Sequence, residues 1–253
     1  MLDRLRNRVV VVVGAGSGIG AATAIRVARE GAQVAVCDVN PAAAEVVAGG
    51  IGTPAAAFAI DVADPASVDA AFAAVVAHFG RIDAVHSNAA DMRAIHLDSN
   101  ALEVDLALFD RTIAVNLRGG LLVTRAALPH LLTAGGGALV YTSSDAGDAG
   151  EPERPCYAMA KSGLNALMRH VASRWGNQGI TANCIAPGFV MTPELAAGGA
   201  VPPEFIAAVL RQGRSTRLGT VEDIAAMVAH LVSDDGRWIT GQVLHVNGGA
   251  ILA

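Results

Sequence analysis

The chain has 253 residues, of which 53% are hydrophobic and 16% charged, so it can bury a substantial core and is not disordered. Its formal charge of −5 argues against a nucleic-acid or anionic-membrane partner, because both require clustered lysine and arginine. No apolar run approaches the ~18–20 residues of a membrane span, and we therefore expect a soluble, cytoplasmic, globular protein.

Short runs rich in β-forming residues alternate with longer stretches of helical periodicity along the chain. The candidate strands are Val9–Val13, Gln33–Cys37, Ala55–Ile60, Ile82–Ser87, Ala138–Thr142, Thr181–Ile185 and Gln242–Val246. The candidate helices are Ile19–Glu30, Pro65–Phe79, Leu106–Leu132, Pro155–Trp175 and Val221–Val232. Several strand candidates are continuously apolar, which is typical of parallel strands covered on both faces. The alternation predicts βαβ units, and it fits both a doubly wound sheet and an eight-fold barrel.

A glycine-rich turn follows the first strand and opens the next helix. Its spacing is G-x-x-x-G-x-G through Gly14, Gly18 and Gly20, since Ile19 stands where G-x-G-x-x-G would need glycine. Such glycines allow a tight turn and let the backbone approach a diphosphate at the helix N-terminus. This turn favours the doubly wound sheet. We predict one α/β domain over residues 1–253, Rossmann-type, with a seven-stranded, mostly parallel sheet and helices on both faces.

The second strand ends at Asp38, 18 residues after Gly20. A carboxylate there can accept hydrogen bonds from the adenosine ribose hydroxyls and repel a 2′-phosphate. Neither arginine nor lysine lies in the glycine-rich turn or directly after Asp38. The sequence therefore predicts NAD as the cofactor in preference to NADP, although a solvated turn aspartate is the plainer interpretation of Asp38.

One long segment, residues 189–220, interrupts the regular alternation with three prolines and several glycines. It contains an apolar helical piece, Phe205–Leu210. Long irregular inserts are usually functional loops, so we predict a substrate lid. Its apolar residues favour a lipophilic substrate, or they pack against one another: Met191, Leu195, Val201, Phe205, Ile206, Val209 and Leu210.

A tyrosine and a lysine form a Y-x-x-x-K motif: Tyr157 is one of two tyrosines in the chain, and Lys161 is its only lysine. Residues four apart share a helix face, and a nearby ammonium stabilises a phenolate and lowers its pKa. Tyr157 can then take a proton from an alcohol or return it to a carbonyl. Ser144, 13 residues earlier, can donate a hydrogen bond to the substrate oxygen.

Together these motifs resemble the short-chain dehydrogenase/reductase family, and the resemblance covers essentially the whole chain. Residues 87–90 (Ser-Asn-Ala-Ala) are similar to the family's NNAG segment, with serine and alanine in place of the outer asparagine and glycine. Asp61-Val62 matches its adenine-contacting pair, and Pro187-Gly188 with Thr192 matches the segment that holds the nicotinamide carboxamide. Val13 replaces the threonine that often precedes the first glycine.

The resemblance implies a catalytic set of Asn116, Ser144, Tyr157 and Lys161, in which Asn116 positions a water in a proton relay and Lys161 also holds the nicotinamide ribose. It implies that the dinucleotide contacts Gly14, Ser17, Gly18, Ile19, Gly20, Asp38, Asp61, Val62, Asn88, Ala89, Tyr157, Lys161, Pro187, Gly188, Val190 and Thr192. It also implies a homotetramer.

The function predicted from these residues is NAD-dependent oxidation of a lipophilic secondary alcohol, or reduction of the matching ketone. Two alternatives stay open. One is an NADPH-dependent 3-oxoacyl-thioester reductase, which Asp38 opposes. The other is a non-catalytic, dinucleotide-binding regulatory protein, which has no need for the complete catalytic set.

Other candidate residues are interpreted more plainly. The seven histidines are scattered, and we predict no metal site. The three cysteines lie far apart and predict no disulfides, and Cys156 is interpreted as a buried hydrophobic residue. Four acidic residues between Ser144 and Tyr157 are expected on a solvated loop, where they can also repel anionic substrates: Asp145, Asp148, Glu151 and Glu153.

Overall fold

The computed structural model describes residues 3–92, 95–198 and 201–252. Within these residues, seven strands form one sheet in the order β3-β2-β1-β4-β5-β6-β9, and every neighbouring pair is parallel. The strands are β1 (Val9–Val13), β2 (Gln33–Asp38), β3 (Ala55–Ala59), β4 (Ala84–Ser87), β5 (Gly137–Thr142), β6 (Ile180–Pro187) and β9 (Val243–Val246). All seven predicted strands are confirmed, with ends that shift by one or two residues.

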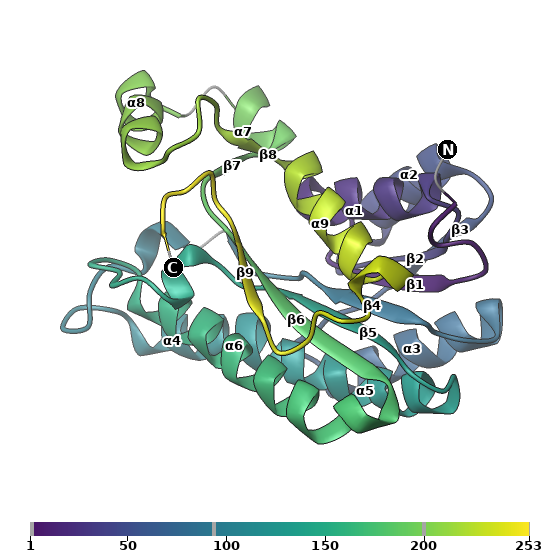
Figure 1. Cartoon of the computed structure of the whole chain (residues 1–253). Coiled ribbons are helices and arrows are strands. Elements are labelled where there is room, and N and C mark those ends of the chain that lie inside the picture. The colour runs from purple at the N-terminus through teal and green to yellow at the C-terminus, as the bar shows by residue number, and fades with distance from the viewer. Residues whose placement is uncertain (1–2, 93–94, 199–200, 253) are drawn as a thin grey trace.

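Two layers of helices cover the sheet (Figure 1). Helices α3 (Pro65–Phe79), α4 (Leu106–Ile113), α5 (Gly119–Thr133) and α6 (Pro155–Trp175) lie on one face. Helices α1 (Gly18–Arg29), α2 (Pro41–Ile51) and α9 (Val221–Leu231) lie on the other. This arrangement is the doubly wound Rossmann-type fold that the sequence predicts.

The alternation of side chains along each strand divides the core into two clusters. In the interior strand β1, which is fully buried, Val11 and Val13 pack beneath α3, α5 and α6. Val10 and Val12 pack beneath α1 and α9. A strand buried on both faces must be apolar at every position, which explains the unbroken run of five valines.

Helix α3 begins and ends where local signals place it, and one predicted helix is interrupted. Helix α3 begins after Asp64, whose carboxylate accepts a hydrogen bond from the Ala66 N–H group at 3.0 Å, and ends at Gly80 in the left-handed conformation. The predicted helix Leu106–Leu132 is wrong as a single element, because a π-helical segment, Ala114–Arg118, separates α4 from α5. Such a bulge has no local sequence signal but is frequent at functional sites.

The described part of the segment predicted to be irregular contains four short regular elements. After β6, a short strand β7 (Val190–Met191) pairs with β8 (Gly219–Thr220), and α7 (Pro193–Ala197) and α8 (Pro203–Gln212) lie between them. The pair α7 and α8 lies beyond one end of the sheet, away from the two helix layers (Figure 1). Residues 199 and 200 of the predicted lid lie outside the described residues.

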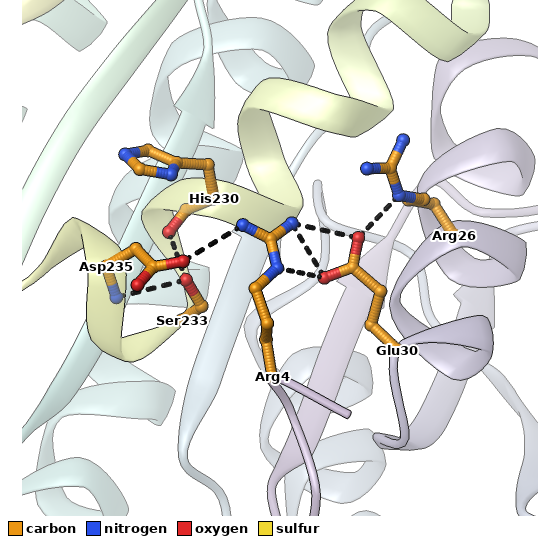
Figure 2. Close-up of polar contacts among 6 residues, drawn as sticks. All are labelled: Arg4, Arg26, Glu30, His230, Ser233 and Asp235. Carbon is orange, nitrogen blue, oxygen red and sulfur yellow. Dashed lines mark hydrogen bonds and ion pairs between the residues drawn. The ribbon is translucent and has the colours of Figure 1, made fainter. Parts of the chain in front are cut away.

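An ionic cluster ties the N-terminal segment to the layer of α1 and α9 (Figure 2). Arg4 donates two hydrogen bonds to the Glu30 carboxylate, at 2.8 and 2.9 Å, and contacts Asp235 at 3.2 Å. Arg26 donates to the same carboxylate at 2.5 Å. Burial raises the pKa of Glu30, but the two arginines outweigh it and hold the pKa below its ordinary value. None of the helices in the described part of the chain has the length and apolar character needed to cross a membrane.

Candidate active site

The predicted cofactor residues gather at the carboxyl ends of the parallel strands. The glycine-rich turn leaves β1, Asp38 ends β2, Asp61 and Val62 follow β3, Asn88 and Ala89 follow β4, and Pro187 ends β6. Strand β1 lies between β2 and β4, so the chain runs outward in opposite directions from this point. Ligands of open α/β sheets bind at such a switch point, outside the carboxyl ends of the strands.

The glycine-rich turn has the shape of a diphosphate cradle. A Cβ atom at Gly20 would lie 1.9 Å from the Gly14 carbonyl oxygen, and one at Gly14 would lie 2.7 Å from Cα of Ala89. Gly14 and Gly18 also adopt positive φ angles, +79° and +52°, which favour glycine. Ser17, the exposed N-cap residue of α1, makes no side-chain cap within the described structure. The first N–H groups of α1 can therefore bind an anion.

A carboxylate from the predicted lid segment contacts this helix end. Glu194, in α7, accepts a hydrogen bond from the Gly18 N–H group at 3.4 Å. The residues around it come from the predicted carboxamide segment: Val190 lies in β7, and Thr192 caps α7 by accepting from the Leu195 N–H group. Ile19, the residue after Gly18, packs against the core beneath α1 and α9. The turn thus fits the diphosphate of a dinucleotide, which carries the same kind of charge as Glu194.

The carboxylates after β2 and β3 occupy the positions expected for the adenosine half of a dinucleotide. Asp38 accepts hydrogen bonds from the Gly16 N–H group at 2.8 Å and the Asn40 N–H group at 2.9 Å, which fixes its side chain beside the glycine-rich turn. Asp61 is exposed and accepts a hydrogen bond from the Ala63 N–H group. Val62 is buried against the start of α5. These contacts are compatible with the predicted roles, which stay predictions.

Three of the four predicted catalytic residues lie together between β5 and α6. Ser144 follows β5, and its hydroxyl is hydrogen-bonded to Tyr157, in the first turn of α6. The Lys161 ammonium lies 5.5 Å from the centroid of the Tyr157 ring and donates a hydrogen bond to the Thr142 carbonyl at 2.7 Å. A phenol, an ammonium and a hydroxyl are therefore within reach of one small substrate group.

The electrostatics of this group differ from the sequence-based expectation. Burial raises the pKa of Tyr157 above its ordinary value of 10.0, and the hydrogen bond from Ser144 only partly opposes it. Burial also lowers the pKa of Lys161 to about 8. The direction is thus opposite to the expected lowering of the Tyr157 pKa by Lys161: desolvation is the largest influence on the phenol, and the ammonium is directed at the Thr142 carbonyl.

The fourth predicted residue, Asn116, lies in the π-helical segment between α4 and α5 and is 2% exposed. Its Oδ1 atom accepts a hydrogen bond from the Asp91 N–H group at 2.8 Å, which joins the segment to the loop after β4. Its Nδ2 atom is buried without a hydrogen-bond partner among the described residues. The side chain therefore already holds the loop, and a role in a proton relay stays a prediction.

Sequence reasoning missed a residue that shapes this site from a distance. Asp98, 4% exposed, accepts hydrogen bonds from the N–H groups of Cys156 at 3.3 Å and Tyr157 at 2.9 Å. Arg154, at the N-cap position of α6, has a left-handed backbone and provides no side-chain cap. Asp98 therefore caps α6 from a loop 59 residues away, a pairing that no local motif indicates.

Comparisons with known proteins agree with this geometry. A family model described as Enoyl-(Acyl carrier protein) reductase matches residues 14–250. A probable short-chain type dehydrogenase/reductase of Bradyrhizobium diazoefficiens is 40% identical, over 99% of this chain and 89% of the relative. The chain belongs to the short-chain dehydrogenase/reductase family. Proteins of this family are oxidoreductases that use a nicotinamide cofactor, and the relatives of this member act on hydroxyl or keto groups.

Two further relatives indicate which kinds of substrate similar proteins act on. A (3R)-3-hydroxyacyl-CoA dehydrogenase of Mus musculus is 36% identical, over 98% of each chain. A solved 7α-hydroxysteroid dehydrogenase, in complex with NADH and 7-oxo glycochenodeoxycholic acid, superposes with a TM-score of 0.90 at 28% identity, over 100% of this chain and 97% of that one.

Proposed function

We propose that the protein is an NAD-dependent dehydrogenase that oxidises a lipophilic secondary alcohol or reduces the matching ketone. The observation that carries the proposal is the group of Ser144, Tyr157 and Lys161 at the same edge of the sheet as the glycine-rich turn. When bound, the nicotinamide accepts the hydride from the carbinol carbon or supplies it to the carbonyl carbon.

The protein's own residues manage the proton and the developing charge. In the reductive direction Tyr157, whose raised pKa keeps it protonated at neutral pH, donates its proton to the substrate oxygen. The nearby Lys161 ammonium stabilises the phenolate that this transfer leaves, and in the oxidative direction that phenolate accepts the hydroxyl proton and becomes the phenol again. The Ser144 hydroxyl donates a hydrogen bond to the substrate oxygen. Asn116 completes the proposed set, as the resemblance to the family implies.

The choice of NAD rests on Asp38. Its carboxylate is held beside Gly16, at the end of β2, where it would meet a 2′-phosphate with like charge. The NADH in the related 7α-hydroxysteroid dehydrogenase is consistent with this choice. The other proposed dinucleotide contacts are those that the sequence predicts, from Gly14 to Thr192.

The lipophilic substrate rests on the segment 189–220, which we propose as the lid of a single catalytic domain. Phe189 and Phe205 make an edge-to-face contact, with ring centroids 5.2 Å apart, which joins α8 to the end of β6. Leu195 and Phe205 are still 39% and 45% exposed, so apolar surface is available to a substrate. A homotetramer and a cytoplasmic location stay predictions from the family and the composition.

Absorbance of the reduced nicotinamide tests this proposal. NAD⁺ or NADP⁺ would be mixed with hydroxysteroids, cyclic alcohols and 3-hydroxyacyl thioesters, with wild-type protein and the Tyr157→Phe variant. The matched control is Tyr141→Phe, because Tyr141 is the only other tyrosine and its hydroxyl bonds to Thr124 in the core. We expect turnover of a lipophilic alcohol with NAD⁺, lost in Tyr157→Phe and retained in Tyr141→Phe.

The alternative outcomes are distinct. Turnover of the thioester with NADP⁺ as the preferred cofactor would replace the proposal by an acyl-thioester reductase; the name of the mouse relative supports the thioester as a substrate class. NADH binding without turnover of any compound would favour a regulatory protein. Equal activity of wild type and Tyr157→Phe would refute the proposed mechanism.

A further inference from the structure

A buried histidine that the proposed mechanism does not use lies next to the cofactor residues. His86, in β4, is fully buried, two residues before Asn88. Its Nε2 atom lies 2.8 Å from the Thr142 hydroxyl oxygen, and that hydroxyl donates to Oδ1 of Asn88 at 2.9 Å. The Nδ2 group of Asn88 donates to the Gly14 carbonyl at 2.9 Å. Four residues, from β4 and the position just after it, from β5 and from the glycine-rich turn, thus form one continuous series of hydrogen bonds.

The Gly14 carbonyl oxygen, at the end of this series, determines which group donates in each hydrogen bond. The Gly14 carbonyl oxygen can only accept, so Asn88 must present its NH₂ group there and its Oδ1 atom to Thr142. The Thr142 hydroxyl donates its single proton to Asn88. The Thr142 hydroxyl oxygen must therefore accept a hydrogen bond from His86. Neutral His86 therefore carries its proton on Nε2. Its Nδ1 atom, which has no hydrogen-bond partner among the described residues, is then a bare acceptor.

The surroundings of His86 keep the imidazole neutral. The pKa of His86 is lowered to about 3 by burial and by the positive charge of Lys161. Lys161 is itself bonded to the Thr142 carbonyl at 2.7 Å. Thr142 thus bonds through its hydroxyl to the cofactor side of the site and through its carbonyl to the proposed catalytic side.

We propose that His86 is a positioning residue of the cofactor site: its Nε2–H group orients the Thr142 hydroxyl, and through Asn88 it fixes the Gly14 carbonyl and the glycine-rich turn. The inference rests on the proposed dinucleotide function. An aliphatic residue at position 86 would leave the Thr142 oxygen without a donor, so its hydroxyl would be held at one end only. Since the net strength of a single hydrogen bond is modest, we expect dinucleotide affinity to fall about 3- to 10-fold.

The first test measures NADH binding by calorimetry. His86→Leu removes the donor at similar volume, Thr142→Val removes the hydroxyl, and His86→Gln provides an alternative N–H donor. The matched control is Val85→Ala, because Val85 is equally buried on the same strand but packs in the opposite core cluster. We expect the Kd for NADH to rise about 3- to 10-fold in the first two variants. It should stay unchanged in Val85→Ala and recover most of the loss in His86→Gln.

The second test is a measurement on the wild-type protein, so it does not depend on whether a variant folds. Nitrogen NMR of the imidazole should report the Nε2–H tautomer, without titration between about pH 5 and about pH 8, where ordinary histidines change charge. An Nδ1–H tautomer, or a His86→Leu variant that binds NADH like wild type, would overturn the inference. Failure of wild-type protein to bind NADH would instead overturn the proposed function.

Discussion

The cap that Asp98 provides to α6 leads to a prediction with a definite size. Replacing Asp98 by alanine leaves the N–H groups of Cys156 and Tyr157 without their shared acceptor at the start of the helix. Losing an N-cap costs ~0.5–2 kcal/mol, and a buried donor left unsatisfied costs ~1–3 kcal/mol. The Cys156 bond, at 3.3 Å, is long and contributes little of this. These are two descriptions of the same lost hydrogen bond, so we expect the free energy of unfolding to fall by about 1–3 kcal/mol.

The same substitution should also reduce activity, because Tyr157 lies in the unsupported first turn. Chemical denaturation of Asp98→Ala and Asp98→Asn, with kcat and KM measured on the same samples, separates the two effects. Asp98→Asn retains an oxygen acceptor but loses the charge, so its loss of stability and of kcat should be intermediate. KM for NAD⁺ should change little, since the glycine-rich turn is not attached to Asp98.

The matched control for this experiment is Asp64→Ala. Asp64 caps α3 through a single exposed hydrogen bond to Ala66, and α3 carries none of the proposed catalytic residues. We expect a loss of about 1 kcal/mol with unchanged kcat. If Asp98→Ala costs no more stability than Asp64→Ala, or lowers kcat no more, the interpretation of Asp98 as the cap that positions Tyr157 is wrong.

Two further predictions concern the glycine-rich turn and the ionic cluster. Gly20→Ala should weaken NADH binding at least about 10-fold, since a Cβ atom 1.9 Å from the Gly14 oxygen forces the turn open. The control Gly49→Ala, whose Cβ atom would meet nothing within 4 Å, should bind NADH normally in the same calorimetric assay. The lowered pKa of Glu30 means that its contribution to stability is present above the ordinary pKa of 4.5 and is lost as the pH falls through the folded-state pKa. Glu30→Gln should therefore lower the melting temperature near neutral pH and make it fall less steeply toward acid pH, and an unchanged acid dependence would contradict the assignment.

Most of the fold could be predicted because the signals are local or periodic. The apolar strands and the glycine-rich turn together identify the doubly wound sheet, and α3 was bounded correctly by its Asp64-Pro65 start and Gly80 stop. Helix α2 was missed, since Pro41–Ile51 is dominated by alanine, valine and glycine and has no polar face with helical spacing. The small β7–β8 pair was missed because two-residue strands have no detectable pattern.

In the candidate site, too, features with a local sequence signal could be predicted and features set by tertiary packing could not. The Y-x-x-x-K spacing predicts that Tyr157 and Lys161 share a face, and the structure places them beside Ser144. The sequence does not predict how strongly tertiary packing desolvates these groups, so the direction of the Tyr157 pKa shift was wrong. Nor can it predict Asp98, whose partners are backbone N–H groups on a distant helix and therefore leave no trace in side-chain motifs.

The contacts that position the proposed site share one physical feature: most of them join a side chain to backbone. Asp98 binds the N–H group of Tyr157, Lys161 binds the Thr142 carbonyl, and Asn88 binds the Gly14 carbonyl. A backbone partner cannot be removed by substitution, so each of these bonds depends on the identity of one side chain only. That asymmetry explains why a single replacement at Asp98 is informative, whereas the side chains of its partners are free to serve another role. Tyr157 illustrates the point: its N–H group anchors the helix while its phenol faces Ser144.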